Sequence, residues 1–169
     1  MEINEEQEEM KIAFIGTHGT GKTTKVYDVA ASLKKMGHNV NILTEVARES
    51  PFPINEKQPK EAGEWMLFRQ YTKELELHHS CDILVADRSI LDYYIYHLRL
   101  YGGDKTLESF VLDKISTYAY LIYVPINLDF LRVDGTRSVD PVFQLEIDNE
   151  FRNFLRRHKI KCRTLKNKH

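Results

Sequence analysis

The chain has 169 residues, a hydrophobic content of 42% and a charged content of 29%, values that are ordinary for a soluble globular protein and favour a single domain, residues 1–169. No apolar run approaches the length of a membrane span, and the first ten residues, with five Glu and no basic residue, do not resemble a signal peptide. We therefore expect a cytoplasmic protein with no membrane span and a disordered acidic start, residues 1–10.

Charge is unevenly distributed although the net charge is −1. Residues 151–169 carry eight Lys or Arg and no acidic residue. The favoured interpretation is a solvated last helix and strand, and the alternative is a basic surface for nucleic acid or another anionic partner. The two cysteines, Cys81 and Cys162, show no metal-site spacing, so we expect small buried side chains rather than a disulfide.

A glycine-rich loop separates the first predicted strand, about 11–16, from the first predicted helix, about 22–36. Its residues, all predicted to bind nucleotide, are Gly16, Thr17, His18, Gly19, Thr20, Gly21, Lys22, Thr23 and the following Thr24. The run fits G-x-x-x-x-G-K-[ST], the P-loop motif, at every fixed position. A glycine-rich turn without a ligand is the alternative, but the strand and helix around the loop argue against it.

The chemistry of this loop suits a polyphosphate. Glycines let backbone N–H groups approach an anion closely, and the positive end of the helix dipole favours the same charge. Lys22 is predicted to reach the β- and γ-phosphates, and the Thr23 hydroxyl to bind Mg²⁺. Because the chain lacks the Asn-Lys-x-Asp tetrad typical of GTP-binding proteins, ATP is the expected nucleotide. His18, at a variable position of the motif, is expected to face solvent.

Strands and helices alternate along the rest of the chain. Predicted strands cover 40–44, 82–87, 119–124 and 160–165, and predicted helices cover 59–79, 89–101, 105–117 and 140–158, with a lid-like segment at about 127–140. Ser89 and Asp92 form a predicted capping box. The apolar side of the 59–79 helix is expected to hold Trp65, Phe68, Tyr71 and Leu75. This alternation predicts an open parallel α/β sheet with helices on both faces.

Ligands of such sheets bind outside the carboxyl ends of the strands, which places Glu45 and Asp87 on the same edge as the P-loop. We expect Asp87 to bind Mg²⁺, with a helix-capping role as the alternative. Arg88 is expected to stabilise the transferred phosphoryl group, or else to form a structural ion pair. Glu45 is expected to be a general base or to position a water; the alternative is a surface residue paired with Arg48.

These residues resemble the motifs of a known group of enzymes. Lys22-Thr23 and Asp87-Arg88-Ser89 resemble the P-loop and the Asp/Glu-Arg-Ser/His/Tyr motif of the nucleoside and nucleoside-monophosphate kinases. The resemblance covers nearly the whole chain. It implies a P-loop NTPase fold with five parallel strands in the order 2-3-1-4-5, and transfer of the γ-phosphoryl group of ATP to a small acceptor.

A second pair of motifs is most similar to the nicotinamide-riboside kinase domain of the bacterial NAD regulator and to related AAA-like ATPases. These motifs are Glu45-x-x-Arg48 and Asp134-Gly135-x-Arg137. Glu45 also matches the acid with which deoxynucleoside kinases accept the proton of the substrate hydroxyl. Kinases of this group usually have an arginine-rich lid over the phosphates, and the resemblance implies that Arg132 and Arg137 belong to it. Many relatives dimerise, so a homodimer is a further expectation.

The sequence thus predicts an ATP- and Mg²⁺-dependent kinase of a nucleoside, nucleotide or related metabolite. Its predicted catalytic residues are Lys22, Glu45, Asp87 and Arg88. The alternative is a nucleotide-binding switch, an ATPase or GTPase with slow hydrolysis and a macromolecular partner. A lid with few arginines and a basic C-terminus modestly favour this alternative. Several aromatic residues flank the expected site and are placed to stack on a base, although core packing is favoured for most: Trp65, Phe68, Tyr71, Tyr93 and Tyr94.

Overall fold

The computed structural model describes residues 10–126 and 140–165. Residues 1–9 of the acidic start and residues 127–139 of the predicted lid-like segment, with Arg132 and Arg137, lie outside the described residues. The described chain forms a sheet of five parallel strands in the order β2-β3-β1-β4-β5, which confirms the predicted fold class and strand order. The strands are β1 (Met10–Ile15), β2 (Val40–Leu43), β3 (Ile83–Asp87), β4 (Tyr120–Tyr123) and β5 (Arg163–Thr164).

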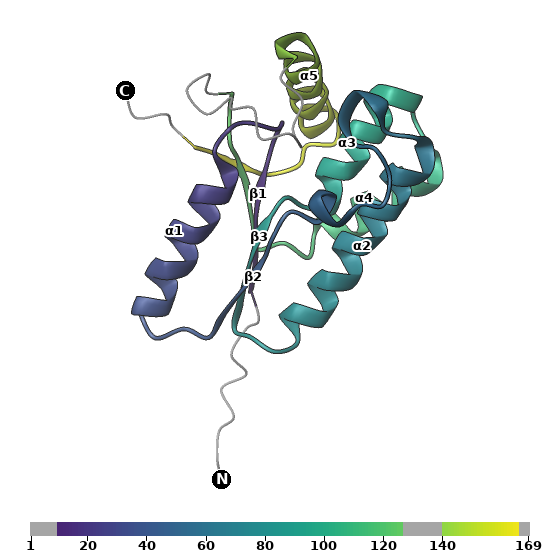
Figure 1. The fold of residues 1–169 in the computed structure, drawn as a ribbon. Coiled ribbons are helices and arrows are strands. Elements are labelled where there is room, and N and C mark those ends of the chain that lie inside the picture. Colours follow the sequence, from purple (N-terminus) through teal and green to yellow (C-terminus); the bar gives the residue numbers. More distant parts are fainter. Residues whose placement is uncertain (1–9, 127–139, 166–169) are drawn as a thin grey trace.

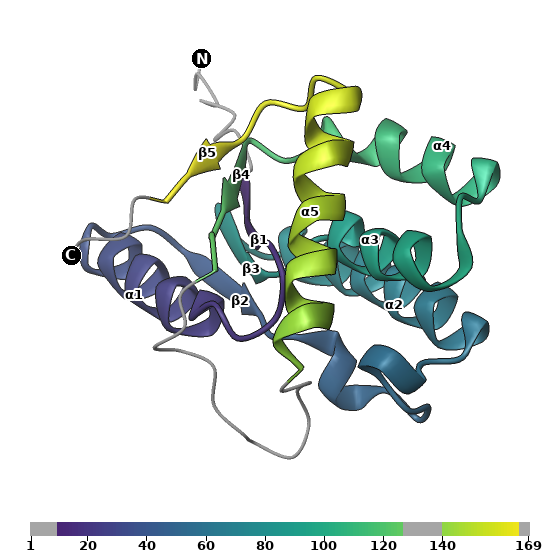
Figure 2. The ribbon, with the colours of Figure 1, turned by 90° about the horizontal axis from the view of Figure 1, so that it is seen from above.

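Helices cover both faces of this sheet, but unequally. Among the described residues, helix α1 lies alone on one face, and the other α-helices lie on the opposite face (Figures 1 and 2). The α-helices are α1 (Lys22–Lys35), α2 (Lys60–His78), α3 (Ile90–Tyr101), α4 (Lys105–Ile115) and α5 (Pro141–Arg157). Two short 3₁₀ helices, η1 (Val46–Glu49) and η2 (Asn55–Lys57), connect β2 to α2.

The core is divided by the sheet because successive side chains of a strand point to opposite faces. In β1, Ala13 and Ile15 belong to the larger apolar cluster beneath α2, α3 and α5, whereas Ile12 and Phe14 belong to the smaller cluster beneath α1. The central strands are buried on both sides, which explains their nearly continuous apolar sequences.

The register of the central strands brings the predicted site together. Phe14 of β1 lies opposite Asp87 of β3, so Asp87 ends its strand next to the start of the P-loop. Helix α3 then begins with the predicted capping box, in which Ser89 accepts from the backbone of α3 and Asp92 accepts from the backbone N–H of Ser89. This cap fixes where β3 ends and where the next helix begins.

The buried face of α2 differs from the predicted one. Phe68 and Leu75 are 46% and 54% exposed, and the buried residues of the helix are Ala62, Gly63, Met66, Leu67, Gln70 and Glu74. The reason is a buried polar contact that apolar periodicity does not reveal, since Glu74 faces the core and accepts from Lys11 Nζ at 3.1 Å.

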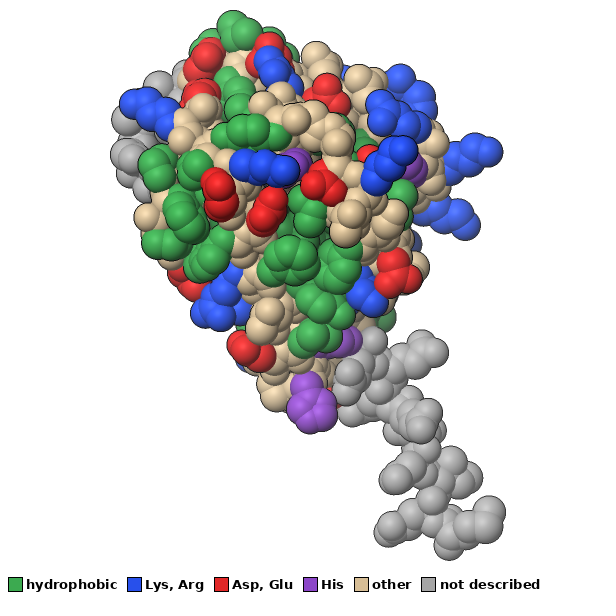
Figure 3. Space-filling view, turned by 90° about the vertical axis from the view of Figure 1, so that its right-hand side faces the viewer, with side chains coloured by type: hydrophobic (Ala, Val, Ile, Leu, Met, Phe, Trp, Pro, Cys, Tyr) green, Lys and Arg blue, Asp and Glu red, His purple; other side chains and the backbone are tan. Residues whose placement is uncertain are grey.

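Exposed Phe68 packs on the surface instead, whereas Tyr71 is partly buried and packs against the core. The rings of Phe68 and Tyr71 lie 5.5 and 5.1 Å from the ring of Phe110 on α4. Figure 3 shows hydrophobic side chains gathered on this face of the molecule.

The end of the chain also departs from expectation. The predicted strand 160–165 is reduced to Arg163–Thr164, which pairs with the edge of β4, so Cys162 precedes the strand and is half-buried. Cys81 is buried, and both cysteines are free thiols, as predicted. None of the helices in 10–126 and 140–165 combines the length and the apolar character that crossing a membrane requires.

Candidate functional site

The P-loop joins β1 to α1, and its backbone has a shape that glycine makes possible. Gly16 has φ +132°, and a Cβ at this position would lie 2.8 Å from the carbonyl oxygen of Val124. Gly21 precedes α1 with φ 82°, and no side chain among the described residues caps that helix. The first backbone N–H groups of α1 are therefore left to a ligand, and they favour an anion.

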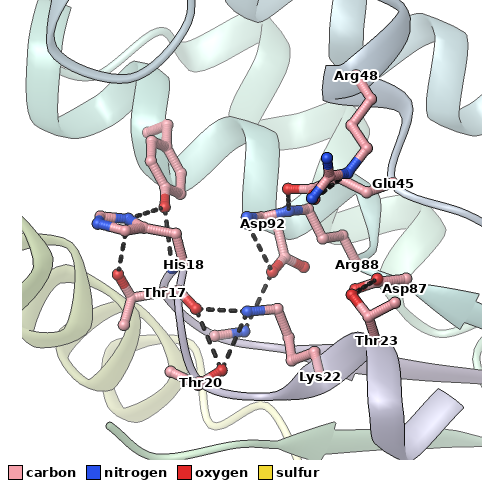
Figure 4. Close-up of polar contacts among 12 residues, drawn as sticks. Thr17, His18, Thr20, Lys22, Thr23, Glu45, Arg48, Asp87, Arg88 and Asp92 are labelled. Carbon is pink, nitrogen blue, oxygen red and sulfur yellow. Dashed lines mark hydrogen bonds and ion pairs between the residues drawn. The ribbon is translucent and has the colours of Figure 1, made fainter. Parts of the chain in front are cut away.

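Lys22 is buried at the first turn of α1 and contacts its own loop (Figure 4). Its ammonium group donates to the carbonyl oxygen of Thr17 and to Thr20 Oγ1, the latter at 3.2 Å. Burial, followed by the nearby guanidinium of Arg88, lowers the pKa of Lys22 to about 8, although three neighbouring carboxylates act in the opposite direction. The P-loop and the first backbone N–H groups of α1 together form a cradle for an anion. A polyphosphate bound in this cradle would favour the charged form of Lys22.

Thr23 and Asp87 meet on the side of the cradle nearest β3. Thr23 Oγ1 donates to Asp87 Oδ2 at 2.5 Å, and Ser89, not Asp87, is the N-cap residue of α3. A hydroxyl and a carboxylate are oxygen ligands of the kind that Mg²⁺ takes. No group of three or more His, Cys, Asp or Glu able to hold a metal occurs in the described part of the chain. The pair thus fits a Mg²⁺ ion that takes its other ligands from phosphate oxygens and water.

Glu45 and Arg88 form a buried ion pair between the ends of β2 and β3 (Figure 4). Arg88 Nε donates to Glu45 Oε1 at 2.7 Å, and Arg48 Nε lies 3.4 Å from Glu45 Oε2. Glu45 is therefore buried, and its partners include both arginines, not Arg48 alone. Arg88 has φ 84°, a left-handed conformation that costs a non-glycine residue free energy.

His18 does not face solvent, which corrects the expectation for this residue. It is 1% exposed, and its Nδ1 lies 2.7 Å from the hydroxyl of Tyr96 on α3. Its ring packs on Phe143 of α5 with centroids 6.0 Å apart, and its carbonyl oxygen accepts from Gln144 Nε2 at 2.8 Å. The packing of α3 and α5 over the P-loop, a tertiary feature, causes this burial.

Asp92 contacts the P-loop directly, a role that sequence reasoning missed. Its Oδ1 accepts from the backbone N–H of Gly16 at 3.1 Å, and its Oδ2 accepts from Ser89 N and Ser89 Oγ at 2.8 and 2.9 Å. Burial raises the pKa of Asp92, and the cations of Arg88 and Lys22 oppose that shift. Because all three contacts are donors, the carboxylate is the form that fits the geometry.

Two hollows meet at Glu45 and Arg88. The first is lined by P-loop residues 19–23 and by Asp87, and the second extends away from the P-loop toward η2 and α2. The space between the walls of the second hollow, open solvent at its mouth included, measures about 410 Å³. Of the five aromatic residues predicted to flank the site, Tyr93 alone lines this pocket.

Comparison with known proteins gives one family and a shared fold. A family model described as "AAA domain" matches residues 11–169. No curated protein sequence matches the chain.

Among solved structures, NadR protein in complex with NR is similar with a TM-score of 0.72 and 20% identity, covering 94% of this chain and 46% of that one. Thymidylate kinase from Ehrlichia chaffeensis gives 0.67 and 18%, with coverages of 96% and 89%. Deoxyadenosine kinase from M. mycoides gives 0.64 and 20%, with coverages of 92% and 88%. At these identities the similarity shows the fold, which is that of P-loop nucleotide kinases.

Proposed function

Because the chain belongs to the AAA domain family and has a P-loop nucleotide kinase-like fold, we propose that it transfers the γ-phosphoryl group of ATP to a small-molecule acceptor. One observation carries this proposal. The cradle at the start of α1 and the neighbouring pocket share Glu45 and Arg88, so a nucleotide in one and an acceptor in the other would meet at these two side chains. A switch that only binds and hydrolyses a nucleotide does not require a second pocket at this position.

In the proposed reaction, an acceptor hydroxyl oxygen forms a bond to the γ-phosphorus while the bond between that phosphorus and the β,γ-bridging oxygen breaks, releasing ADP. Glu45 takes the proton of the attacking hydroxyl. Arg88 and Lys22 stabilise the charge that develops on the phosphoryl oxygens. Mg²⁺, held by Thr23 and Asp87, would supply further neutralisation of phosphate charge when bound. The proposal keeps Arg132 and Arg137 as lid residues, although they lie outside the described residues.

The acceptors of the structural neighbours indicate where to look for this one. The similar structures are those of a deoxyadenosine kinase, a thymidylate kinase and NadR protein in complex with NR. We therefore propose a nucleoside, a nucleotide or a related metabolite as the acceptor, a cytoplasmic location and ATP with Mg²⁺ as cosubstrates. A homodimer and an anionic partner for the basic C-terminus remain predictions.

The test is ADP formation from MgATP in the presence of a panel of nucleosides, nucleotides and related hydroxyl compounds. We expect one chemical class to stimulate ADP release and to become phosphorylated. Glu45→Gln should lower kcat by at least about 100-fold and leave the MgATP dissociation constant unchanged, because a general base typically contributes 10²- to 10⁴-fold.

The matched control is Glu49→Gln, which alters an exposed glutamate that pairs with Lys73 and Arg69 outside the site. Unchanged turnover in Glu45→Gln would remove the proposed role of this residue. If no compound in the panel stimulated ADP release and a macromolecule bound only the nucleotide-loaded protein, the switch would be favoured instead.

A further inference from the structure

The pocket beyond Glu45 contains two buried polar groups that have no hydrogen-bond partner among the described residues. These groups are the hydroxyl of Tyr93 and the amide nitrogen Nε2 of Gln58, and both side chains are 3% exposed and line the pocket. Buried polar groups are nearly always paired in folded proteins, because a missing partner costs free energy. Two such groups in one pocket therefore indicate a ligand that supplies the missing partners.

Contacts with α3 and α2 fix the position of Gln58. Tyr101 of α3 donates to the Gln58 carbonyl oxygen at 2.5 Å, which ties the loop containing η2 to the helix. Gly63 of α2 leaves room for the amide group, since a Cβ at that position would lie 2.9 Å from Gln58 Nε2. The amide is therefore placed against the backbone of α2, where a side chain would displace it.

The walls of the pocket are of mixed character. Ala47, Ile54 and Met66 supply apolar surface, and Glu45 and Arg88 line both the pocket and the cradle. Apolar walls with a few polar groups suit a flat ring with nitrogen or oxygen atoms on its edge. An amide and a phenol hydroxyl are neutral groups that can donate to, or accept from, such an edge.

The charges around Glu45 favour a hydroxyl group over a phosphate. Arg88 and Arg48 both pair with Glu45, and Arg88 Nη1 also lies 3.9 Å from the buried Asp92. Two cations and two carboxylates balance formally, so a phosphate dianion would meet no net positive charge and would face the Glu45 carboxylate. A hydroxyl group can instead donate to that carboxylate.

We infer that the acceptor is a nucleoside, its base bound by Gln58 and Tyr93 and its sugar hydroxyl directed at Glu45. This inference rests on the proposed function and names the substrate class of the same site. A nucleoside combines the three required parts, namely a flat ring with a hydrogen-bonding edge, no charge, and a sugar hydroxyl group that can reach Glu45.

Three variants test the base contacts. Tyr93→Phe removes only the hydroxyl, Gln58→Leu removes the amide at similar volume, and Gly63→Ala displaces the amide without deleting it. Binding of the common ribo- and deoxynucleosides, and of their 5′-monophosphates, is measured by calorimetry, and turnover is measured with MgATP. We expect the wild type to bind a nucleoside more tightly than its monophosphate. Each variant should weaken nucleoside binding about tenfold, the effect of one hydrogen bond, and leave MgATP binding unchanged.

A matched control and a stability measurement separate binding from folding. Tyr94→Phe removes the neighbouring hydroxyl, which donates to Glu108 Oε2 at 2.7 Å outside the pocket, and should leave nucleoside affinity unchanged. Tyr93→Phe should melt no lower than the wild type without ligand, because the deleted hydroxyl has no partner among the described residues.

The outcomes also distinguish the two proposals. Preference for monophosphates with ADP formation, or nucleoside affinities that are the same in Tyr93→Phe, Gln58→Leu and the wild type, would overturn the nucleoside assignment and leave the kinase standing. Nucleoside binding that these variants weaken, without ADP formation, would support the base contacts and overturn the kinase activity. Failure to bind any nucleoside would overturn the inference outright.

Discussion

Replacing Asp92 by asparagine should loosen the P-loop, because both carboxylate oxygens of Asp92 are in use. Oδ1 accepts from Gly16 N, and Oδ2 accepts from Ser89 N and Ser89 Oγ. Asparagine has one acceptor oxygen, so its NH₂ group must face at least one of these donors. One backbone or hydroxyl donor and the new NH₂ group are then buried without acceptors. At about 1–3 kcal/mol for each of the two buried unpaired groups, we expect a loss of about 2–6 kcal/mol in the free energy of unfolding.

The measurement is urea denaturation together with calorimetric titration of MgATP. Asp104→Asn is the matched control, because partly exposed Asp104 caps α4 through one oxygen that accepts from Thr106 N and Leu107 N. Asparagine caps helices about as well as aspartate, so this control should cost less than about 0.5 kcal/mol. Asp92→Asn should also weaken MgATP binding, because Gly16 loses its anchor. A variant within 0.5 kcal/mol of the wild type and with unchanged MgATP affinity would refute the reasoning.

Two further predictions concern buried charges. Because burial lowers the pKa of Lys22 to about 8, MgATP affinity measured by calorimetry should fall about tenfold per pH unit above that value as the ammonium is lost; a flat profile would contradict this. The same lowered pKa makes the unfolded chain bind more protons than the folded one between about pH 8 and the ordinary lysine value of 10.5, so this group adds stability without ligand as pH rises through that window. Lys11→Met should lower the free energy of unfolding, measured by urea denaturation, by about 3–5 kcal/mol, because it leaves Glu74 buried without its cation. The double variant Lys11→Met/Glu74→Gln should recover most of this loss. The loss in Lys11→Met should shrink as pH falls, because burial raises the pKa of Glu74 and protonation removes the buried charge; a single variant as stable as the wild type would refute the pairing.

The sheet could be predicted because its determinants are local. Apolar runs, the P-loop glycines and the Ser89–Asp92 cap each specify where an element begins or ends, and the rule for parallel sheets then places the strand ends on one edge. For this reason the structure brings Lys22, Glu45 and Asp87 to the same edge, as the sequence predicts. Their catalytic and metal-binding roles stay predictions.

What the sequence could not predict depends on contacts between distant segments. The burial of His18 requires α3 and α5 to pack over the P-loop, and α5 starts more than a hundred residues later. The anchor of Gly16 on Asp92 depends on how β1 and β3 align. The buried face of α2 includes Glu74, a charged residue whose partner lies on β1, so apolar periodicity wrongly assigned the exposed Phe68 and Leu75 to that face. No local pattern encodes these pairings.

The shared position of Glu45 and Arg88 has a thermodynamic consequence. Two ligands that touch the same pair of side chains cannot bind independently, and linkage requires their mutual effect to be equal in both directions. If an anion bound in the cradle changes the affinity of the pocket for its ligand by some factor, the pocket ligand must change the affinity of the cradle for the anion by the same factor. A single molecule that joins both ligands by a tether of suitable length would replace two association steps by one. Its gain in affinity over the separate ligands would measure how close the two hollows lie in solution.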